Sequence, residues 1–221
     1  MSGDIPSGAR ALVLTVSDGV AAGTRPDQSG IALADRLAIV GFRVDRRSVS
    51  DERAPIEAAL REGAQDHVFV ISTGGTGLTP RDVTPQATLA VIDYEVPGLA
   101  EAMRAAGRAT TPMADLSRGV VGVIGRSLVV NVPGSPNAAI ESLAALEPTL
   151  GHALETLAGP YDHDTEGTPG LAERDDEAIA APATTAPPAA TLAADDELGI
   201  PEIPPGDRSD PWRDLPKSTP E

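Results

Sequence analysis

Apolar residues follow two alternating patterns through the first 159 residues, and this alternation predicts an α/β fold. Residues 10–16 form a short β-branched run. Residues 42–49 alternate between apolar and polar, which predicts a half-buried strand, and residues 67–72 form a continuous apolar run, as expected for a strand covered on both faces. Between them, one stretch of helical spacing opens at Ser29 and another covers residues 55–64. We therefore expect a three-layer α/β domain with a mostly parallel sheet flanked by helices.

The second half of this region adds helices and an antiparallel element. One helical pattern begins near Pro85, and a second covers about residues 97–106. Both begin with proline, which is tolerated in a first helical turn. Two apolar segments, 119–124 and 128–132, are separated by only three residues, which predicts a hairpin that adds an antiparallel pair to the sheet. A final helix, with leucines along one face, begins near Ser135.

The chain changes character near residue 159. Residues 1–159 carry a net charge of −5 and residues 160–221 one of −11, which together give the −16 of the whole chain. The second part also holds 11 of the 21 prolines and has little apolar surface to offset the entropy of ordering. We expect a flexible N-terminus at 1–8, one folded domain at 9–159 and a disordered, acidic, Pro- and Ala-rich tail at 160–221. The only tryptophan, Trp212, could dock on a partner, although a solvating spacer is the simpler interpretation.

Composition excludes several kinds of chemistry. The chain has no cysteine, so disulfides, thiolate nucleophiles and Cys-based zinc sites are ruled out. Its acidic balance argues against binding nucleic acid through phosphate neutralisation. The N-terminus lacks the order of a signal peptide, and no apolar run approaches the ~20 residues of a transmembrane helix. We expect a cytoplasmic protein with no membrane or nucleic-acid partner.

Lysine is almost absent. Lys217 lies in the expected tail, and arginine supplies the other 16 positive charges. A Walker A loop places a lysine beside the nucleotide phosphates. A P-loop nucleotide site is therefore excluded from the folded part of the chain.

Polar or glycine-rich segments follow four of the expected strands. They are residues 17–18, 50–51, 73–82 and 131–136. The carboxyl ends of parallel strands line one crevice, where ligands bind. We expect the four segments to form a composite site, although any one of them alone is equally well interpreted as an ordinary turn.

The strongest local signal is the sequence TGGTG at residues 73–77. Three glycines in five positions allow backbone N–H groups to face an anion. After it, Arg81 could clamp an anionic oxygen, Asp82 could hold a divalent metal, and Thr84 could cap a helix N-terminus that itself attracts anions. The alternatives are a surface ion pair between Arg81 and Asp82 and a purely structural cap at Thr84.

These motifs resemble the molybdopterin adenylyltransferase family. The TGGTG at 73–77 followed by PRDVTP at 80–85 carries most of the resemblance, and SDG at 17–19 and NVPGSPNAA at 131–139 support it. The resemblance covers about residues 9–159. It implies a molybdopterin-binding fold, usually a homotrimer, that transfers AMP from MgATP to the terminal phosphate of molybdopterin and releases pyrophosphate. A partner molybdotransferase then uses the product.

The resemblance also implies roles for particular residues. The catalytic carboxylates, which would hold Mg²⁺, match Asp51 and Asp82, with Ser50 in place of the family's proline. A catalytic serine matches Ser117 to within one or two residues of register. From its position alone, Asp51 could equally be a helix N-cap. The residues expected to bind substrate are Ser17, Asp18, Thr73, Gly74, Gly75, Thr76, Gly77, Arg81, Thr84, Asn131, Pro133, Gly134 and Ser135.

Two other functions fit the same motifs. The domain could be a non-catalytic module that binds molybdopterin or a partner protein. It could also resemble the hydrolases of dinucleotide pyrophosphates that carry a similar glycine loop, although those usually have an additional domain. The presence of both Asp51 and Asp82 favours the transferase.

Overall fold

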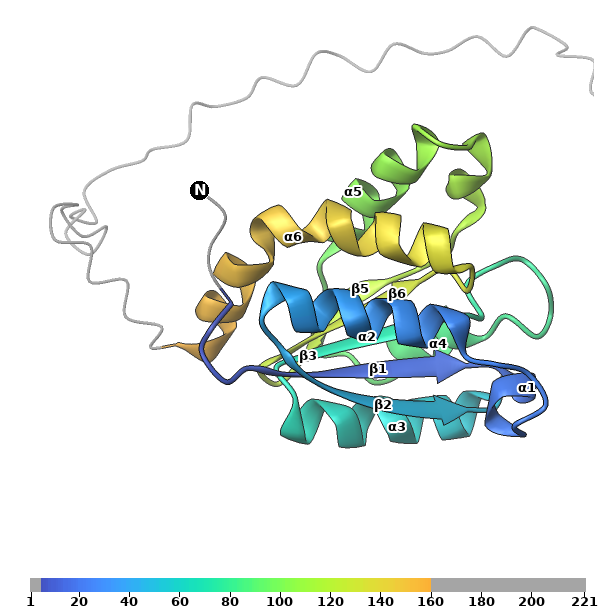
Figure 1. Ribbon diagram of the computed structural model, residues 1–221, viewed down its shortest axis with the longest axis horizontal. Helices are drawn as coiled ribbons and strands as arrows, with labels where there is room; N and C mark the ends of the chain where they lie inside the picture. Colours follow the sequence, from blue (N-terminus) through green and yellow to red (C-terminus); the bar gives the residue numbers. More distant parts are fainter. Residues whose placement is uncertain (1–4, 160–221) are drawn as a thin grey trace, which may run out of the picture. The chain divides into compact units, whose positions relative to one another are not determined.

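A computed structural model of the chain describes residues 5–159, which form one six-stranded sheet between two layers of helices (Figure 1). The strands lie in the order β2-β1-β3-β6-β5-β4. This arrangement confirms the three-layer α/β fold. The acidic tail and Trp212 lie outside the described residues.

The sheet is parallel on one side and antiparallel on the other. Its strands are β1 (Arg10–Val16), β2 (Arg43–Val49), β3 (Phe69–Thr73), β4 (Tyr94–Glu95), β5 (Val121–Ile124) and β6 (Ser127–Val132). β1 pairs in parallel with β2 and β3, and β3 pairs in parallel with β6. The predicted hairpin is confirmed, since β5 runs antiparallel to β6 and also pairs with the short β4.

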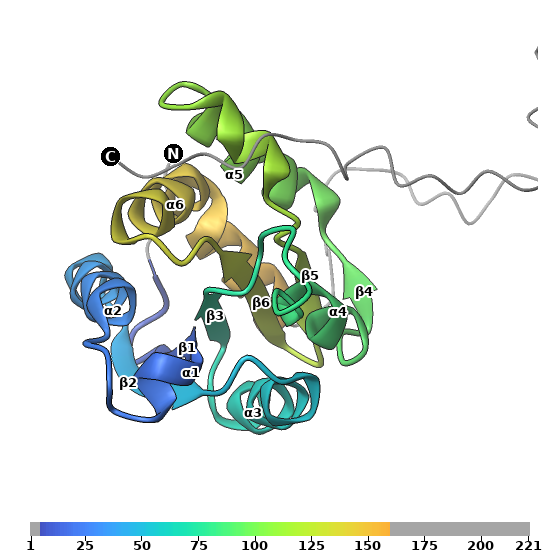
Figure 2. The ribbon, with the colours of Figure 1, turned by 90° about the vertical axis from the view of Figure 1, so that its right-hand side faces the viewer.

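Helices cover both faces of the sheet. They are α1 (Asp18–Ala21), α2 (Gln28–Val40), α3 (Arg53–Asp66), α4 (Thr84–Leu89), α5 (Pro97–Arg108) and α6 (Pro136–Ala158), with a 3₁₀ helix, η1, at Pro112–Leu116. α2, α5 and α6 lie over one face, and α3 and α4 over the other (Figure 2). Within residues 5–159, no helix combines the length and hydrophobicity needed to cross a membrane.

The buried strand β3 explains why the core has two halves. Phe69 and Ile71 are fully buried in the cluster beneath α2 and α6, whereas Val70 is fully buried in the cluster against α3. Both faces of β3 are therefore apolar, as its continuous apolar run predicts. Phe69 also stacks on Phe42, with ring centroids 5.6 Å apart.

Strand β2 is more exposed than its alternating sequence predicts. Val49 is its only buried residue, and Arg43, Arg46 and Arg47 are exposed. β2 is an edge strand that pairs only with β1. Charged side chains on such an edge oppose pairing with another chain, so the alternation here does not mark a half-buried strand.

Replacement of Ile56 by alanine tests the core. Ile56 lies in α3 and is fully buried, so Ile56→Ala should lower the free energy of unfolding by about 2–5 kcal/mol. Ile39→Ala is the matched control, because Ile39 is also helical but is 77% exposed; it should change stability by only about 0.5 kcal/mol. Urea unfolding measures both, and equal losses would contradict the assigned core.

Candidate functional site

The loops after β1 and β2 are joined by a reciprocal pair of hydrogen bonds at the carboxyl edge of the sheet, which faces the viewer in Figure 2. The backbone N–H of Asp51 donates to Oδ1 of Asp18 over 3.0 Å. The backbone N–H of Asp18 donates to Oδ2 of Asp51 over 2.8 Å. Each aspartate thus holds the other's backbone, and both carboxylates lie at one edge.

The loops after β3 and β6 are tied to the same edge. Arg81, in the loop after β3, forms an ion pair with Asp18. The hydroxyl of Thr73 donates to the carbonyl oxygen of Pro133 over 2.8 Å. The structure therefore brings together the four predicted loop segments. The expected alternative of an Arg81–Asp82 ion pair is wrong, because the carboxylate that Arg81 contacts belongs to Asp18.

Asp18 is an electrostatic centre of this network. The backbone N–H of Asp51 lowers the pKa of the Asp18 carboxyl below its usual value, and the Arg81 guanidinium lowers that pKa further. Both partners stabilise the carboxylate form. Asp18 therefore carries its negative charge under neutral conditions.

The glycine loop requires residues without side chains at two positions. Gly74 has φ +103°, and a Cβ there would overlap the carbonyl oxygen of Val16. Gly75 has φ +63°, and a Cβ there would overlap the hydroxyl of Thr84. That buried hydroxyl donates to the carbonyl oxygen of Gly74 over 2.9 Å.

Thr84 holds the glycine loop and does not cap a helix. It is the first residue of α4, whose N-cap is Val83, and its hydroxyl is directed to Gly74. The expectation of a Thr84 cap is therefore wrong. The side chain fixes the loop from beneath and has no free path to a ligand, since it is fully buried.

One side of the glycine loop borders a polar pocket of about 410 Å³. Of the predicted residues, those that line it are Ser17, Asp51, Thr73, Gly74, Gly75, Gly134 and Ser135. The same pocket is also lined by Arg25 and Asp27, which belong to the segment that connects α1 to α2 and were not predicted from the sequence. Asp27 is the N-cap of α2 and also accepts a hydrogen bond from Thr15.

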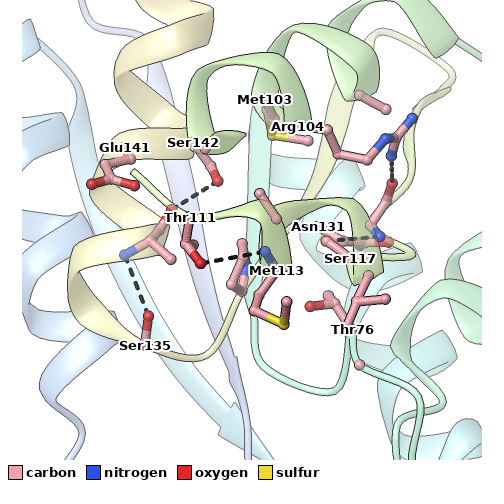
Figure 3. A pocket seen from close by; sticks show the side chains of 18 residues that line it. Thr76, Met103, Arg104, Thr111, Met113, Ser117, Asn131, Ser135, Glu141 and Ser142 are labelled. Carbon is pink, nitrogen blue, oxygen red and sulfur yellow. Dashed lines mark hydrogen bonds between the residues drawn. The ribbon is translucent and has the colours of Figure 1, made fainter. Parts of the chain in front are cut away.

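The other side of the loop borders an apolar pocket of about 320 Å³ (Figure 3). The predicted residues that line it are Thr76, Gly77, Ser117, Asn131, Pro133 and Ser135. Its remaining wall comes from α5, η1 and α6, and includes Met103, Arg104, Met113, Leu116 and Glu141. These residues carry no recognisable motif, and η1 is too short to show a periodic pattern.

The two pockets adjoin at the glycine loop and at Ser135. Gly74 and Gly75 border the polar pocket, whereas Thr76 and Gly77 border the apolar one. Ser135 lines both pockets and is the N-cap of α6, where its hydroxyl accepts from the N–H of Ala138. A long helix therefore begins at the junction, and the positive end of its dipole favours an anion there.

The two candidate catalytic aspartates differ in their surroundings. Asp51 lines the polar pocket, and the N-cap of α3 is Glu52, so the expectation that Asp51 caps this helix is wrong. Asp82 lines neither pocket. Its Oδ2 accepts from the hydroxyl of Thr79 over 2.6 Å and from the N–H of Thr79 over 2.8 Å.

The Thr79 hydroxyl is the main cause that lowers the pKa of Asp82, and backbone N–H groups and the charge of Arg118 act in the same direction. Asp82 is therefore also ionised under neutral conditions. Among residues 5–159, no three His, Cys, Asp or Glu side chains are grouped so as to hold a metal ion.

Asn131 supports the apolar pocket from below. Its amide group donates to the hydroxyls of Ser72 and Thr88 over 2.9 Å each, and its oxygen accepts from the N–H of Val120. The side chain is 1% exposed. These three bonds hold β6 against β3, α4 and the residue before β5, and so fix this part of the pocket wall.

The chain is similar to known proteins in sequence and fold. Residues 12–152 match the family described as the probable molybdopterin binding domain. The molybdenum cofactor biosynthesis bifunctional protein of Synechococcus elongatus is 42% identical over 161 residues, which are 72% of this chain and 50% of that protein. The molybdopterin adenylyltransferase of Haemophilus influenzae is 40% identical over 148 residues, covering 64% of this chain and 75% of its own length.

A solved structure agrees with these sequence matches. The molybdopterin biosynthesis enzyme MoaB of Thermus thermophilus is 48% identical and has a TM-score of 0.64. The match covers 68% of this chain and 97% of that one. The chain spans about half the length of the bifunctional relative and most of the length of the adenylyltransferase and of MoaB.

Substitution of Gly74 tests the packing of the glycine loop. Gly74→Ala should destabilise the fold by about 1–3 kcal/mol through backbone strain, with a further loss from overlap with Val16. Gly23→Ala is the control, since Gly23 has φ +70° but open space around its Cβ position. Chemical denaturation should show the larger loss for Gly74→Ala, and equal losses would refute the close contact.

The Asp18 network predicts a dependence of stability on pH. A carboxyl whose pKa is lowered by folding stabilises the fold above its unfolded pKa of about 3.9 and loses this contribution as pH falls through the folded value. When the pH is lowered from neutral to about 2, the stability of Asp18→Asn should therefore fall by less than that of the wild type. Thermal melts across this range measure it. If melting temperature changed with pH in the same way in both proteins, the folded state would not lower the pKa of Asp18.

Proposed function

Since the chain belongs to the family of probable molybdopterin-binding domains, we propose that it transfers AMP from ATP to molybdopterin and releases pyrophosphate. The names of its relatives, which include several molybdopterin adenylyltransferases, support this reaction. The product would pass to a molybdotransferase, and the existence of bifunctional cofactor-biosynthesis relatives is consistent with such a partner. We also propose a cytoplasmic location, as expected from the sequence, and a homotrimer, as the family resemblance implies.

The observation that carries the proposal is that two pockets adjoin at the glycine loop and Ser135. A transferase of this kind must bind two substrates and bring a phosphate group of each together. Here the glycine loop passes from one pocket to the other, and Ser135 lines both. One pocket has the polar groups that suit phosphate, and the other has apolar walls that suit a flat heterocycle.

The reaction joins two anions. A terminal phosphate oxygen of molybdopterin would attack the α-phosphorus of ATP; a P–O–P linkage forms, and the bond to the β-phosphate breaks as pyrophosphate leaves. The attacking oxygen is already ionised, so no general base is required. Catalysis then consists of positioning and of neutralising charge. The N-terminus of α6 and the backbone N–H groups of Gly75 and Thr76 would supply positive charge for that role, together with Arg81 at the same edge of the sheet.

Asp51 and Asp82 would hold Mg²⁺, whose bound form neutralises phosphate charge. The donor set fits this ion, because Mg²⁺ commonly takes one or two protein carboxylates and completes its shell with water and substrate phosphates. Asp51 lines the polar pocket. The Asp82 carboxylate is bonded to Thr79, so its participation requires a change in its side-chain conformation.

The orientation of Asp82 also favours a second candidate function. A domain that binds molybdopterin without reacting it needs the pockets but does not need Asp82 beside them. In such a module the bonds from Thr79 to Asp82 would persist when ligand is bound. An activity measurement separates the two functions.

Pyrophosphate release from MgATP in the presence of molybdopterin tests the transferase. Asp51→Asn and Asp82→Asn in the full chain should each lower the rate by about 10²–10³-fold while molybdopterin affinity stays close to that of the wild type. Asp66→Asn, which changes an exposed aspartate at the end of α3, is the matched control and should leave the rate unchanged.

Two results would contradict this proposal. Wild-type protein that binds molybdopterin but releases no pyrophosphate would show a binding module. If Asp82→Asn released pyrophosphate at nearly the wild-type rate, Asp82 would have no part in the mechanism. Asp51 would then be the one proposed carboxylate ligand that remains.

A further inference from the structure

Residues 77–82 form an exposed arm at the end of the glycine loop. Leu78 is 64% exposed, and Thr79, Pro80 and Arg81 are exposed as well. The hydrogen bonds inside the arm join Asp82 to Thr79 through side chain and backbone. These bonds shape a turn but do not attach it to the domain. A segment with so few buried contacts opens easily unless other groups hold it.

Two arginines attach the arm to the rest of the fold. Arg81 contacts Asp18 from the exposed part of the arm. Arg118 reaches both ends: its Nε donates to the carbonyl oxygen of Gly77 over 2.7 Å, and its Nη2 donates to that of Asp82. Its backbone N–H also donates to the carbonyl oxygen of Thr76 over 3.0 Å. Arg118 therefore spans the base of the arm.

The geometry of these bonds suits arginine in particular. The guanidinium group is a planar fork whose N–H donors have fixed directions, so one side chain can hold two acceptors at once. Both acceptors here are backbone carbonyl oxygens of the arm. A lysine ammonium has no such fork and would hold the two ends less well.

Arg118 acts from behind the pocket. Its neighbours Ser117 and Gly119 line the apolar pocket, as do Thr76 and Gly77, but Arg118 itself does not. It therefore connects two parts of the pocket wall that are far apart in sequence. It is half-buried, so solvent competes less for its hydrogen bonds than for those of an exposed side chain.

The two attachments differ in what substrate binding would do to them. If Arg81 turns the nitrogen that contacts Asp18 toward a phosphate group, the exposed attachment is lost. The bonds of Arg118 lie at the base of the arm and need not break. Arg118 then keeps Thr76, Gly77 and Asp82 in place.

We propose that Arg118 is a positioning residue for AMP transfer, which holds residues 77–82 in the reactive arrangement while Arg81 turns to the substrate. This inference rests on the proposed function. It differs from a general structural role, because the arm contributes little buried surface to the core.

Chemical rescue tests this role in the full-length protein. Arg118→Ala should lower kcat for pyrophosphate release by about 10–100-fold, since a small displacement of reacting groups has an effect of this size. The KM for ATP should change by less than about threefold, because Arg118 touches neither pocket. Guanidinium chloride at about 50 mM, well below denaturing concentrations, should restore part of kcat. Sodium chloride at the same ionic strength should not.

Variants and a second measurement complete the test. Arg118→Lys should be impaired more than Arg126→Ala, which alters an exposed arginine in the β5–β6 turn and serves as the matched control. Amide hydrogen exchange should accelerate about tenfold or more across residues 78–82 in Arg118→Ala, and stay unchanged in β1 and β3. If Arg118→Ala instead destabilised the whole fold, amide exchange would accelerate in every strand, and guanidinium would increase the loss of activity.

The outcomes separate this inference from the proposed function. Wild-type protein without pyrophosphate release would end the proposed function, and with it a role in AMP transfer, whereas hydrogen exchange would still show whether Arg118 holds the arm. If the wild type does transfer AMP, either of two results would overturn the positioning role: full activity in Arg118→Ala, or unchanged amide hydrogen exchange across residues 78–82 in that variant.

Discussion

The arrangement of the site depends on how closely the glycine loop packs against the end of β1. At Gly74 the backbone lies so near the carbonyl of Val16 that no side chain fits, and a Cβ on Gly134 would lie 3.3 Å from the Cα of Gly74. Thr84 holds this turn from the interior. Consecutive residues of this loop border the two pockets, and Ser135 lines both, so the pockets adjoin at the loop.

Charge is organised around the same loop by short connections between neighbouring strands. Asp18 joins the loop after β2 to the arm after β3, since it accepts from the backbone of Asp51 and pairs with Arg81. An exposed ion pair of this kind contributes little to stability. In the proposed mechanism this pair would open when Arg81 turns to the substrate, whereas the bonds of Arg118 to two backbone carbonyl oxygens would stay in place.

Much of the fold and part of the site follow from the sequence. Strand composition, proline at helix starts and the turn at Gly125 predict the elements, and parallel strands necessarily bring the segments after them to one edge. Contacts that depend on tertiary packing are not predictable in this way. Met113 and Leu116 reach the apolar pocket from a single 3₁₀ turn, and Asp82 turns toward Thr79 because a nearby hydroxyl and N–H compete for its carboxylate.

A crystal structure with adenylyl-molybdopterin bound would test most directly whether the two pockets form one bisubstrate site. The proposed function predicts that the product occupies both pockets, with its phosphates near the glycine loop and Ser135 in the polar pocket and one of its heterocycles in the apolar pocket. A product that occupies a single pocket, or that binds away from residues 74–77, would contradict this account.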